Sequence, residues 1–461
     1  MKTGANPGNL LCARRGSVLI IVLWIAFGLV SLALYFSNSM NFELRASDNR
    51  VCAQAAEQAI EGAARYINYL LTQQIANGSN GVFLVLDDSL CKAVPVGEAH
   101  YWLIGRDTNT PVGPGRMCFG LVDEASKLNL NMAASDPLSS SNQLIWLPRM
   151  TVDLTQAILD WVSTNGTGPT VSYYAMQQPS YQCKCESFET VDELRLLYAA
   201  DMDTLVGEDA NRNGILDPNE NDDNQNGMLD PGILEYVTVY SREPNTNSDG
   251  SAKINISSLR SDSSGLRSIL QTNFGAERVT VILGQLRTPG SSTNALRNFP
   301  SPLLFYVTST MTATEFALIA TNLTATNGSY ISGRVNVNTA SAAVLACLLG
   351  DDTAAAQQLV SYRQANPNNL TSIAWVVDAL GQSYATDLQT LEAGDYITTL
   401  SYQCTADIAA VGPYGRGYRR VKFVFDTSGG TPQIVYRQDL TQLGWALGKE
   451  VRQNLYSAKG T

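Results

Sequence analysis

The sequence has few of the residues on which most catalytic and nucleic-acid-binding sites depend. It contains one histidine, His100, which excludes sites built from paired histidines. Only 16% of its residues are charged, and 42 acids against 31 bases give a formal net charge of −11. A nucleic-acid-binding surface needs an excess of basic residues, so we expect no nucleic-acid partner. The cysteines form no CxxC pair, which excludes zinc modules. No GxSxG, P-loop or HExxH motif is present, and we predict that the protein is not an enzyme.

What the sequence does contain first is a long apolar segment near its start. Residues 17–36 are uncharged (SVLIIVLWIAFGLVSLALYF), and the next charge is Glu43. Twenty helical residues rise about 30 Å, the thickness of the hydrocarbon core of a bilayer. The basic residues Lys2, Arg14 and Arg15 precede this segment, so the positive-inside rule predicts a cytoplasmic N-terminus and an exported remainder.

A helical pattern continues beyond the apolar segment. Small and apolar residues recur from Cys52 to Leu70 at steps of three and four, with charged residues between them. No proline interrupts residues 17–73. We therefore predict one continuous helix of about 85 Å, with one half in lipid and the other against a soluble domain.

This N-terminus resembles the prepilin signal of type IV pilins and type II secretion pseudopilins. The resemblance lies in Arg14-Arg15-Gly16, the apolar segment and the long amphipathic helix. It implies cleavage after Gly16 by a prepilin peptidase and N-methylation of Ser17. Most members carry a glutamate at the fifth mature position, which here is Ile21. That carboxylate neutralises the N-terminal amine of a neighbouring subunit, and loss of the glutamate is typical of minor pseudopilin K. A buried charge without its partner costs several kcal/mol, so the absence predicts a place at the fibre tip.

Three similar stretches lie in the middle of the chain. Each alternates apolar residues with asparagine and leads into a helical pattern: 127–131 (KLNLN), 253–257 (KINIS) and 334–338 (RVNVN). We interpret them as three diverged copies of a strand-plus-helices unit. The third copy resembles a helix-hairpin-helix unit, with residues 348–352 (LLGDD) as its hairpin. Such hairpins hold a DNA phosphate with backbone amides, but Asp351 and Asp352 would repel it.

Strand patterns flank this central region on both sides. We predict strands at 99–104 and 117–122 before it, and at 396–406, 420–425 and 433–438 after it. The predicted fold is α+β: a long helix on a pilin-like antiparallel sheet, interrupted by a mainly α-helical insertion of helix-hairpin-helix type. The expected segments are a leader (1–16), a transmembrane helix (17–36), its amphipathic continuation (37–73), the first strands (74–126), the insertion (127–395) and the last strands with the C-terminus (396–461).

A calcium-loop pattern lies inside the insertion. In the twelve residues 209–220, oxygen-bearing side chains occupy positions 1, 3, 5, 9 and 12, Gly214 is at the sharp turn of position 6, and position 7 offers a main-chain carbonyl. Alternate residues of such a loop direct their oxygens at one hard cation. The predicted ligands are Asp209, Asn211, Asn213, Ile215, Asp217 and Glu220.

The pattern returns at 222–233 with its last position missing. Position 12 is Ile233, and we expect Glu235 or an acid of the first loop to take its role. Pro218 and Pro231 prevent a regular helix from leaving either loop, so structural clips are predicted rather than opening sensors. The predicted ligands of this second, incomplete loop are Asp222, Asn224, Asn226, Met228 and Asp230.

Cleavage after Gly16 would remove Cys12 and leave seven cysteines, whose pairing the sequence does not determine. We expect Cys347 to be an inert core thiol, and Cys183 and Cys185 to need different partners.

Together these features predict a minor pseudopilin of the type II secretion pseudopilin K family, anchored once in the bacterial inner membrane with its bulk in the periplasm. By resemblance it would cap the pseudopilus tip, initiate assembly, and contact minor pseudopilins I and J and major pseudopilin G. The resemblance also implies contact with secreted cargo or the outer-membrane secretin. The alternative is a DNA-uptake minor pilin whose helix-hairpin-helix units bind DNA.

Overall fold

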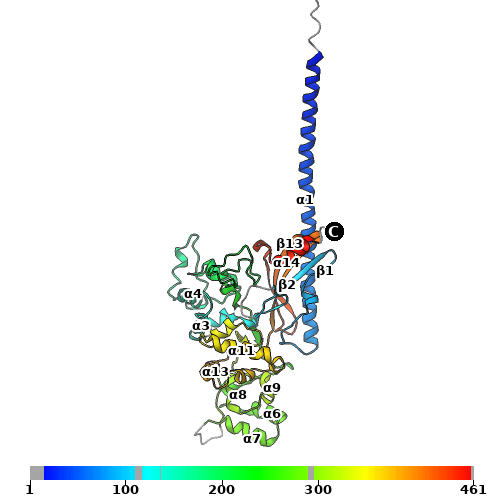
Figure 1. Cartoon of the computed structure of the whole chain (residues 1–461). Coiled ribbons are helices and arrows are strands. Elements are labelled where there is room, and N and C mark those ends of the chain that lie inside the picture. Colours follow the sequence, from blue (N-terminus) through cyan, green and yellow to red (C-terminus); the bar gives the residue numbers. More distant parts are fainter. Residues whose placement is uncertain (1–14, 109–116, 135, 289–294, 458–461) are drawn as a thin grey trace, which may run out of the picture.

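The computed structural model describes residues 15–108, 117–134, 136–288 and 295–457. The predicted leader therefore lies outside the described residues, apart from its last two positions. One helix, α1 (Arg15–Ala76), runs for 62 residues, or about 93 Å, without a break. Its N-terminal half projects from the folded body as an isolated rod (Figure 1). The prediction of one continuous helix is confirmed, and it extends three residues past its expected end.

The two halves of α1 differ in burial. Residues 18–51 are exposed, including the whole apolar segment, and within the described residues α1 is the one helix long and apolar enough to span a bilayer. Burial begins at Cys52, where Ala56, Ile60 and Ile67 face a sheet. The small residues at three- and four-residue steps let the sheet approach the helix backbone closely.

The sheet combines segments from both ends of the chain. Its strands follow the order β1 (Val94–Val96), β2 (Ala99–Ile104), β12 (Gln403–Gly412), β13 (Arg416–Asp426) and β14 (Gln433–Asp439), and β3 (Val122–Asp123) also pairs with β12. All these pairings are antiparallel. This confirms that N- and C-terminal segments share one sheet.

The central strand β12 is buried along its whole length because both faces of the sheet are covered. Ile408 and its neighbours on one face pack against α1, while Ala409 and Val411 on the other face pack against the C-terminal residues Ala446 and Leu447. The turn between β12 and β13 lies directly on α1. A Cβ atom added at Gly412 would lie 2.2 Å from the carbonyl oxygen of Cys52, so only glycine fits there.

Two strand predictions were wrong in part. Residues 117–122 form only an isolated bridge at Phe119 and the start of β3, because Gly120 adopts a φ of +151° that interrupts the strand. The stretch 396–406 divides into β11 (Ile397–Thr398) and the start of β12. Since β11 pairs inside the insertion, the insertion extends to Thr398, three residues past its expected end.

The three repeats adopt one common arrangement. In each, a two-residue strand pairs in parallel with a two-residue strand at the end of the same unit: β4 (Leu128–Asn129) with β5 (Val237–Thr238), β7 (Ile254–Asn255) with β8 (Leu323–Thr324), and β10 (Val335–Asn336) with β11. The strand asparagine accepts a hydrogen bond from the backbone N–H two residues on in every copy. The threonine of the returning strand does the same. The second copy is therefore a full unit.

Helices fill the interval between the paired strands of each unit. Together they form one hydrophobic core that is separate from the core beneath α1. Figure 1 shows this insertion beside the sheet and extending beyond its end. The α-helices are α3 (Pro137–Leu144), α4 (Val152–Val162), α5 (Met202–Val206), α6 (Ser264–Asn273), α7 (Ala276–Gln285), α8 (Pro302–Ser309), α9 (Ala313–Ile319), α10 (Ala342–Leu348), α11 (Thr353–Ala365), α12 (Trp375–Leu380) and α13 (Ala385–Glu392). A short α2 (Asp88–Cys91) precedes the sheet, and α14 (Gly448–Ser457) follows it.

Candidate functional site: two acidic loops against the sheet

The first predicted calcium loop folds as a tight turn around its own side chains. Gly214 has a φ of +81°, the left-handed conformation that position 6 requires. Both carboxylate oxygens of Asp209 accept hydrogen bonds, one from the Asn213 N–H and one from the Gly214 N–H, each at 2.8 Å. The side chain at position 1 is therefore held toward the inside of the loop.

The other predicted side chains of this loop converge on the same interior. Asp217 Oδ2 lies 2.7 Å from Asn211 Nδ2 and 2.9 Å from Asn213 Nδ2. The two carboxylate oxygens of Glu220 accept from the Asn211 N–H at 3.1 Å and the Asp217 N–H at 2.9 Å. A half-turn of the Asn211 amide would replace its NH₂ group with a carbonyl oxygen, the group that a cation prefers, whereas Asn213 Oδ1 already accepts from the Ile215 N–H at 2.9 Å.

Burial makes this arrangement costly without a cation. Asp209, Asn211 and Asn213 are each at most 5% exposed. Asn211 Oδ1 is buried and has no hydrogen-bond partner among the described residues. Burial raises the pKa of Asp209 and of Glu220, and for Glu220 the charges of Asp209 and Asp217 act in the same direction. A divalent cation would satisfy the orphaned amide oxygen and offset this repulsion, so the residues fit calcium.

A cation here could not rely on carboxylates alone. Among the described residues, no three His, Cys, Asp or Glu side chains lie close enough together to hold a metal. The loop instead mixes acids with asparagine amides and the Ile215 carbonyl, which suits a hard cation with six to eight oxygen ligands rather than zinc.

The second loop repeats the first in a more exposed setting. Asp222 accepts from the Asn226 N–H at 3.2 Å and the Gly227 N–H at 2.8 Å, and Asp230 Oδ2 lies next to the amides of Asn224 and Asn226. Met228, the carbonyl position, is half-buried. The two loops therefore share their local geometry from position 1 to position 9.

Glu208 places a carboxylate against the second loop. Its two oxygens accept from the Asp223 N–H and the Asp230 N–H, both at 2.8 Å. Glu220 likewise binds the N–H of the position 9 aspartate in the first loop, while its second contact is to position 3 rather than position 2. The expectation for Glu235 was wrong, because Glu235 forms a 2.7 Å ion pair with Arg106. Sequence spacing could not reveal Glu208, since it precedes the first loop by one residue.

The first loop is fastened to the sheet by one buried arginine. Arg420 of β13 is 0% exposed and forms a bidentate ion pair with Asp407 of β12, at 2.8 and 2.6 Å. Its remaining N–H groups donate to the main-chain oxygens of Asn211 and Arg212. The loop therefore supplies the acceptors that complete the hydrogen bonding of the buried Arg420 guanidinium in the sheet.

The same loop also holds the C-terminal segment. The Asn211 and Asn213 amides donate to the main-chain oxygens of Trp445 and Ala446, each at 3.2 Å. The loop thus contacts the insertion, the sheet and the C-terminal segment that covers one sheet face.

Asp123 makes a second connection between the sheet and the insertion. This 3% exposed carboxylate accepts from Asn336 Nδ2 at 2.9 Å and from Thr339 Oγ1 and Ser401 Oγ at 2.6 Å each. These donors lie at the start and just past the end of the third repeat. Burial raises the pKa of Asp123 to about 6, although the hydrogen bonds act against it.

The predicted processing residues lie in α1. Gly16 and Ser17 are in its first turn, and Ile21 is 57% exposed on the apolar rod. The cleavage and methylation of these residues stay predictions.

Cys183 and Cys185 do not point in different directions. Their thiols are within hydrogen-bonding reach of each other, and the chain turns at Cys185, whose φ is +52°. The expectation of different partners was wrong on this geometric ground. Cys347 is 1% exposed in the core of α10, and burial raises its pKa to about 12, as expected of an unreactive thiol.

The hairpin between α10 and α11 gives its aspartates a structural role. Asp352 is the N-cap of α11, with its side chain accepting from the Ala355 N–H at 2.8 Å. Gly350 and Asp351 both have positive φ, which turns the chain between the helices. A carboxylate thus occupies the helix N-terminus at which a phosphate would bind.

Comparison with known families identifies this region of the chain. Residues 335–391 match the family described as Type II secretion system (T2SS), protein K. The chain carries a protein K segment. This confirms the resemblance to pseudopilin K over the third repeat, from β10 through α13. No curated protein matches the chain.

Among solved structures, the chain resembles the crystal structure of the GspK-GspI-GspJ complex from the enterotoxigenic Escherichia coli Type 2 Secretion System. The TM-score is 0.41 with 10% sequence identity, and the alignment covers 86% of this chain and 99% of the matched chain.

Proposed function

We propose that the protein is a minor pseudopilin of a type II secretion system that caps the periplasmic pseudopilus and initiates its assembly. The observation that carries the proposal is the protein K segment in a chain that begins with an exposed apolar helix and packs that helix on an antiparallel sheet. The apolar half of α1 would anchor the chain once in the inner membrane, with a cytoplasmic N-terminus and a periplasmic body.

Position at the tip follows from two features. Ile21 offers no carboxylate to the amine of a neighbouring subunit, and the insertion makes the body broad beside the slender helix (Figure 1). A broad body is difficult to stack within a helical fibre. The partners would be minor pseudopilins I and J and major pseudopilin G beneath them, with cargo or the outer-membrane secretin above.

Processing gives the most direct test of this proposal. The full chain is produced with a prepilin peptidase, and its N-terminus is read by mass spectrometry. We expect a mature chain that begins at N-methylated Ser17, while Gly16→Ala remains uncleaved. A wild-type chain that keeps Met1 in the presence of active peptidase would contradict the proposal.

Position can be tested with Ile21→Glu. We expect immunogold labelling of wild-type protein at fibre ends only, and of the variant along the shaft as well. Wild-type label along the shaft would contradict tip capping.

The insertion would be of helix-hairpin-helix type, with its two acidic loops holding calcium as structural clips. Glu208 and Glu220 would each close one loop. The orphaned Asn211 oxygen and the convergent carboxylates support calcium in the first loop, and the matched contacts of Glu208 support it in the second. Calcium would supply the positive charge that these buried oxygens lack, and so would hold the loops against the sheet.

DNA uptake has less support as a function. Asp352 occupies the helix N-terminus that would bind a phosphate, and the net charge is −11. Absence of binding to duplex DNA at low salt is the expected outcome.

A further inference from the structure

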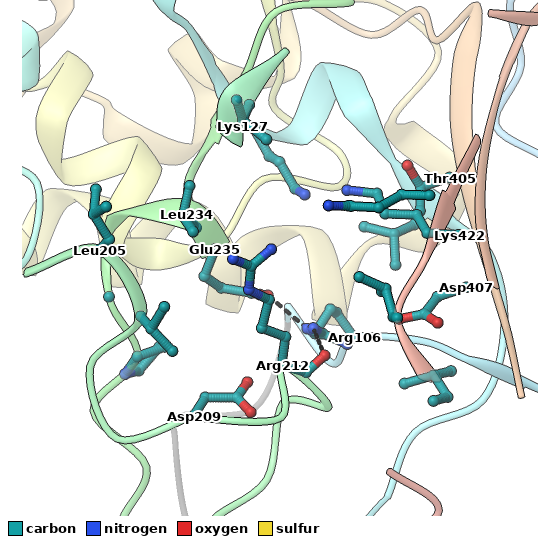
Figure 2. Close-up of a pocket in the computed structure, with 18 residues that line it drawn as sticks. Arg106, Lys127, Leu205, Asp209, Arg212, Leu234, Glu235, Thr405, Asp407 and Lys422 are labelled. Carbon is teal, nitrogen blue, oxygen red and sulfur yellow. Dashed lines mark hydrogen bonds and ion pairs between the residues drawn. The ribbon is translucent and has the colours of Figure 1, made fainter. Parts of the chain in front are cut away.

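A polar cavity lies between the sheet and the first acidic loop, behind the calcium ligands. Its walls come from β2, β12, β13, the first loop and the segment after the second loop, and its volume is about 60 Å³. One water molecule needs roughly 10–15 Å³ of such space, so the cavity has room for about four oxygen atoms. Figure 2 shows the charged side chains that enter it.

Most charges around the cavity are already paired. Arg106 Nε binds Glu235 at 2.7 Å, and Arg420 behind the wall binds Asp407. The oxygens of Asp209 accept two backbone N–H groups within the first loop. Each of these charged groups therefore already has a partner of opposite charge or a backbone donor within the protein.

Three basic side chains have N–H groups without a hydrogen-bond acceptor among the described residues. The ammonium group of Lys422 in β13 forms no hydrogen bond or ion pair with any described residue, although the side chain is partly buried. Lys127 has one ion pair, at 3.7 Å from Glu124, which is beyond hydrogen-bond length. Arg212 Nε is buried without a hydrogen-bond partner among the described residues, while its terminal nitrogens lie 3.4–3.5 Å from Asp192.

These three side chains extend into the same space from different elements (Figure 2). Lys127 comes from the first repeat, Lys422 from the sheet and Arg212 from the first loop. Glu124 lies beside the two lysines, but Thr238 and Thr405 already donate to its oxygens. The charges of Glu124 and Asp407 act on Lys422, but neither carboxylate lies within ion-pair distance of its ammonium group. A buried ammonium group without a close partner is costly.

We infer that this cavity binds one small oxyanion of the sulfate or phosphate class, held by Lys127, Lys422 and Arg212. A tetrahedral oxyanion fills the space of about four oxygens and accepts hydrogen bonds from several directions at once. It would join the sheet, the first repeat and the first loop through one ligand. The inference does not depend on calcium, because Lys127, Lys422 and Arg212 are not predicted calcium ligands.

Sulfate and its heavier analogue selenate are suitable probes. Sulfate binding to the detergent-solubilised full chain is measured by calorimetry and by thermal unfolding, at fixed calcium and with sodium chloride matched for ionic strength. At tenfold excess over its dissociation constant, sulfate is expected to raise the melting temperature by about 2 °C more than chloride does. Selenate located by anomalous diffraction should lie among the three donors.

Lys422→Met is the decisive variant, and Lys449→Met on the exposed face of α14 is its matched control. Both remove one positive charge, so the general effect of sulfate on protein stability is the same in each. We expect Lys422→Met to bind sulfate at least tenfold more weakly and Lys449→Met to bind it like the wild type. Equal sulfate affinity in the two variants overturns the inference. Absence of sulfate binding by the wild type, with millimolar sulfate in 20-fold molar excess over chloride, overturns it as well. Failure of calcium binding would appear separately, as an absent response to chelator.

Discussion

Replacing Arg420 tests whether the first acidic loop and the sheet form one cooperative unit. Arg420→Met would leave the Asp407 carboxylate, which is 6% exposed, without its bidentate partner. Breaking a buried ion pair from one side costs about 3–5 kcal/mol. The Asn211 carbonyl would lose its donor as well, at about 1 kcal/mol, whereas the Arg212 carbonyl would keep the donor from Arg106 Nη2 at 2.9 Å. We expect the free energy of unfolding to fall by about 5 kcal/mol.

The measurement is urea unfolding of the full chain in detergent, followed by tryptophan fluorescence. Trp102 and Trp445 lie in the small core next to this contact and report on it directly. Arg419→Met is the matched control, since its neighbouring guanidinium makes one hydrogen bond, to the Tyr418 carbonyl. Adding Asp407→Leu to Arg420→Met removes the stranded carboxylate and should recover roughly 3 kcal/mol. If Arg420→Met is within about 1 kcal/mol of Arg419→Met, the loop and sheet are not coupled as described here.

Three further outcomes are expected. Excess EDTA should lower the melting temperature, because the buried acids of the first loop would again repel one another. Asp209→Ala should reproduce much of that loss. An unchanged melting curve in EDTA would exclude structural calcium. Glu208→Gln and Glu220→Gln should each reduce the calcium stoichiometry in calorimetry from two to one. Glu186→Gln, outside both loops, is the control. Two ions retained by Glu208→Gln would show that Glu208 does not close the second loop. The pKa of Asp123 is raised to about 6 in the folded state, above its unfolded value of about 3.9. The folded protein therefore binds a proton that the unfolded chain releases, and its stability falls by about 3 kcal/mol as pH rises from about 4 through 6. The difference in stability between wild type and Asp123→Asn should change across that pH range, and a constant difference would show that Asp123 does not titrate there.

Elements with a repeating pattern could be predicted from the sequence. The steps of three and four residues gave α1, and the alternation of apolar residues with asparagine located all three repeats. The returning strands β5, β8 and β11 could not be found, because two residues that end in threonine carry no periodic signal. For the same reason the sequence did not show where each repeat ends.

The acidic loops were predictable position by position because their ligands are local in sequence. The groups that complete them are not local. Glu208 serves a loop that begins 14 residues later, counting from 208 to 222, and Arg420 contacts the first loop from about 200 residues away. Such contacts depend on how the insertion lies on the sheet, which a single sequence does not encode in any spacing.

The pairing of β12 with β2 has a consequence for folding during synthesis. Leu103 pairs with Ile408, so roughly 300 further residues must be synthesised after β2 before β12 can pair with it. At ribosomal rates of about 5–20 residues per second, the open edge of β2 would be unprotected for roughly 15–60 s. Each repeat closes on itself through its own paired strands, so the insertion can fold during this delay. The late strands β12, β13 and β14 then complete the sheet, so loss of these strands would leave the edge of β2 open even when every repeat is folded.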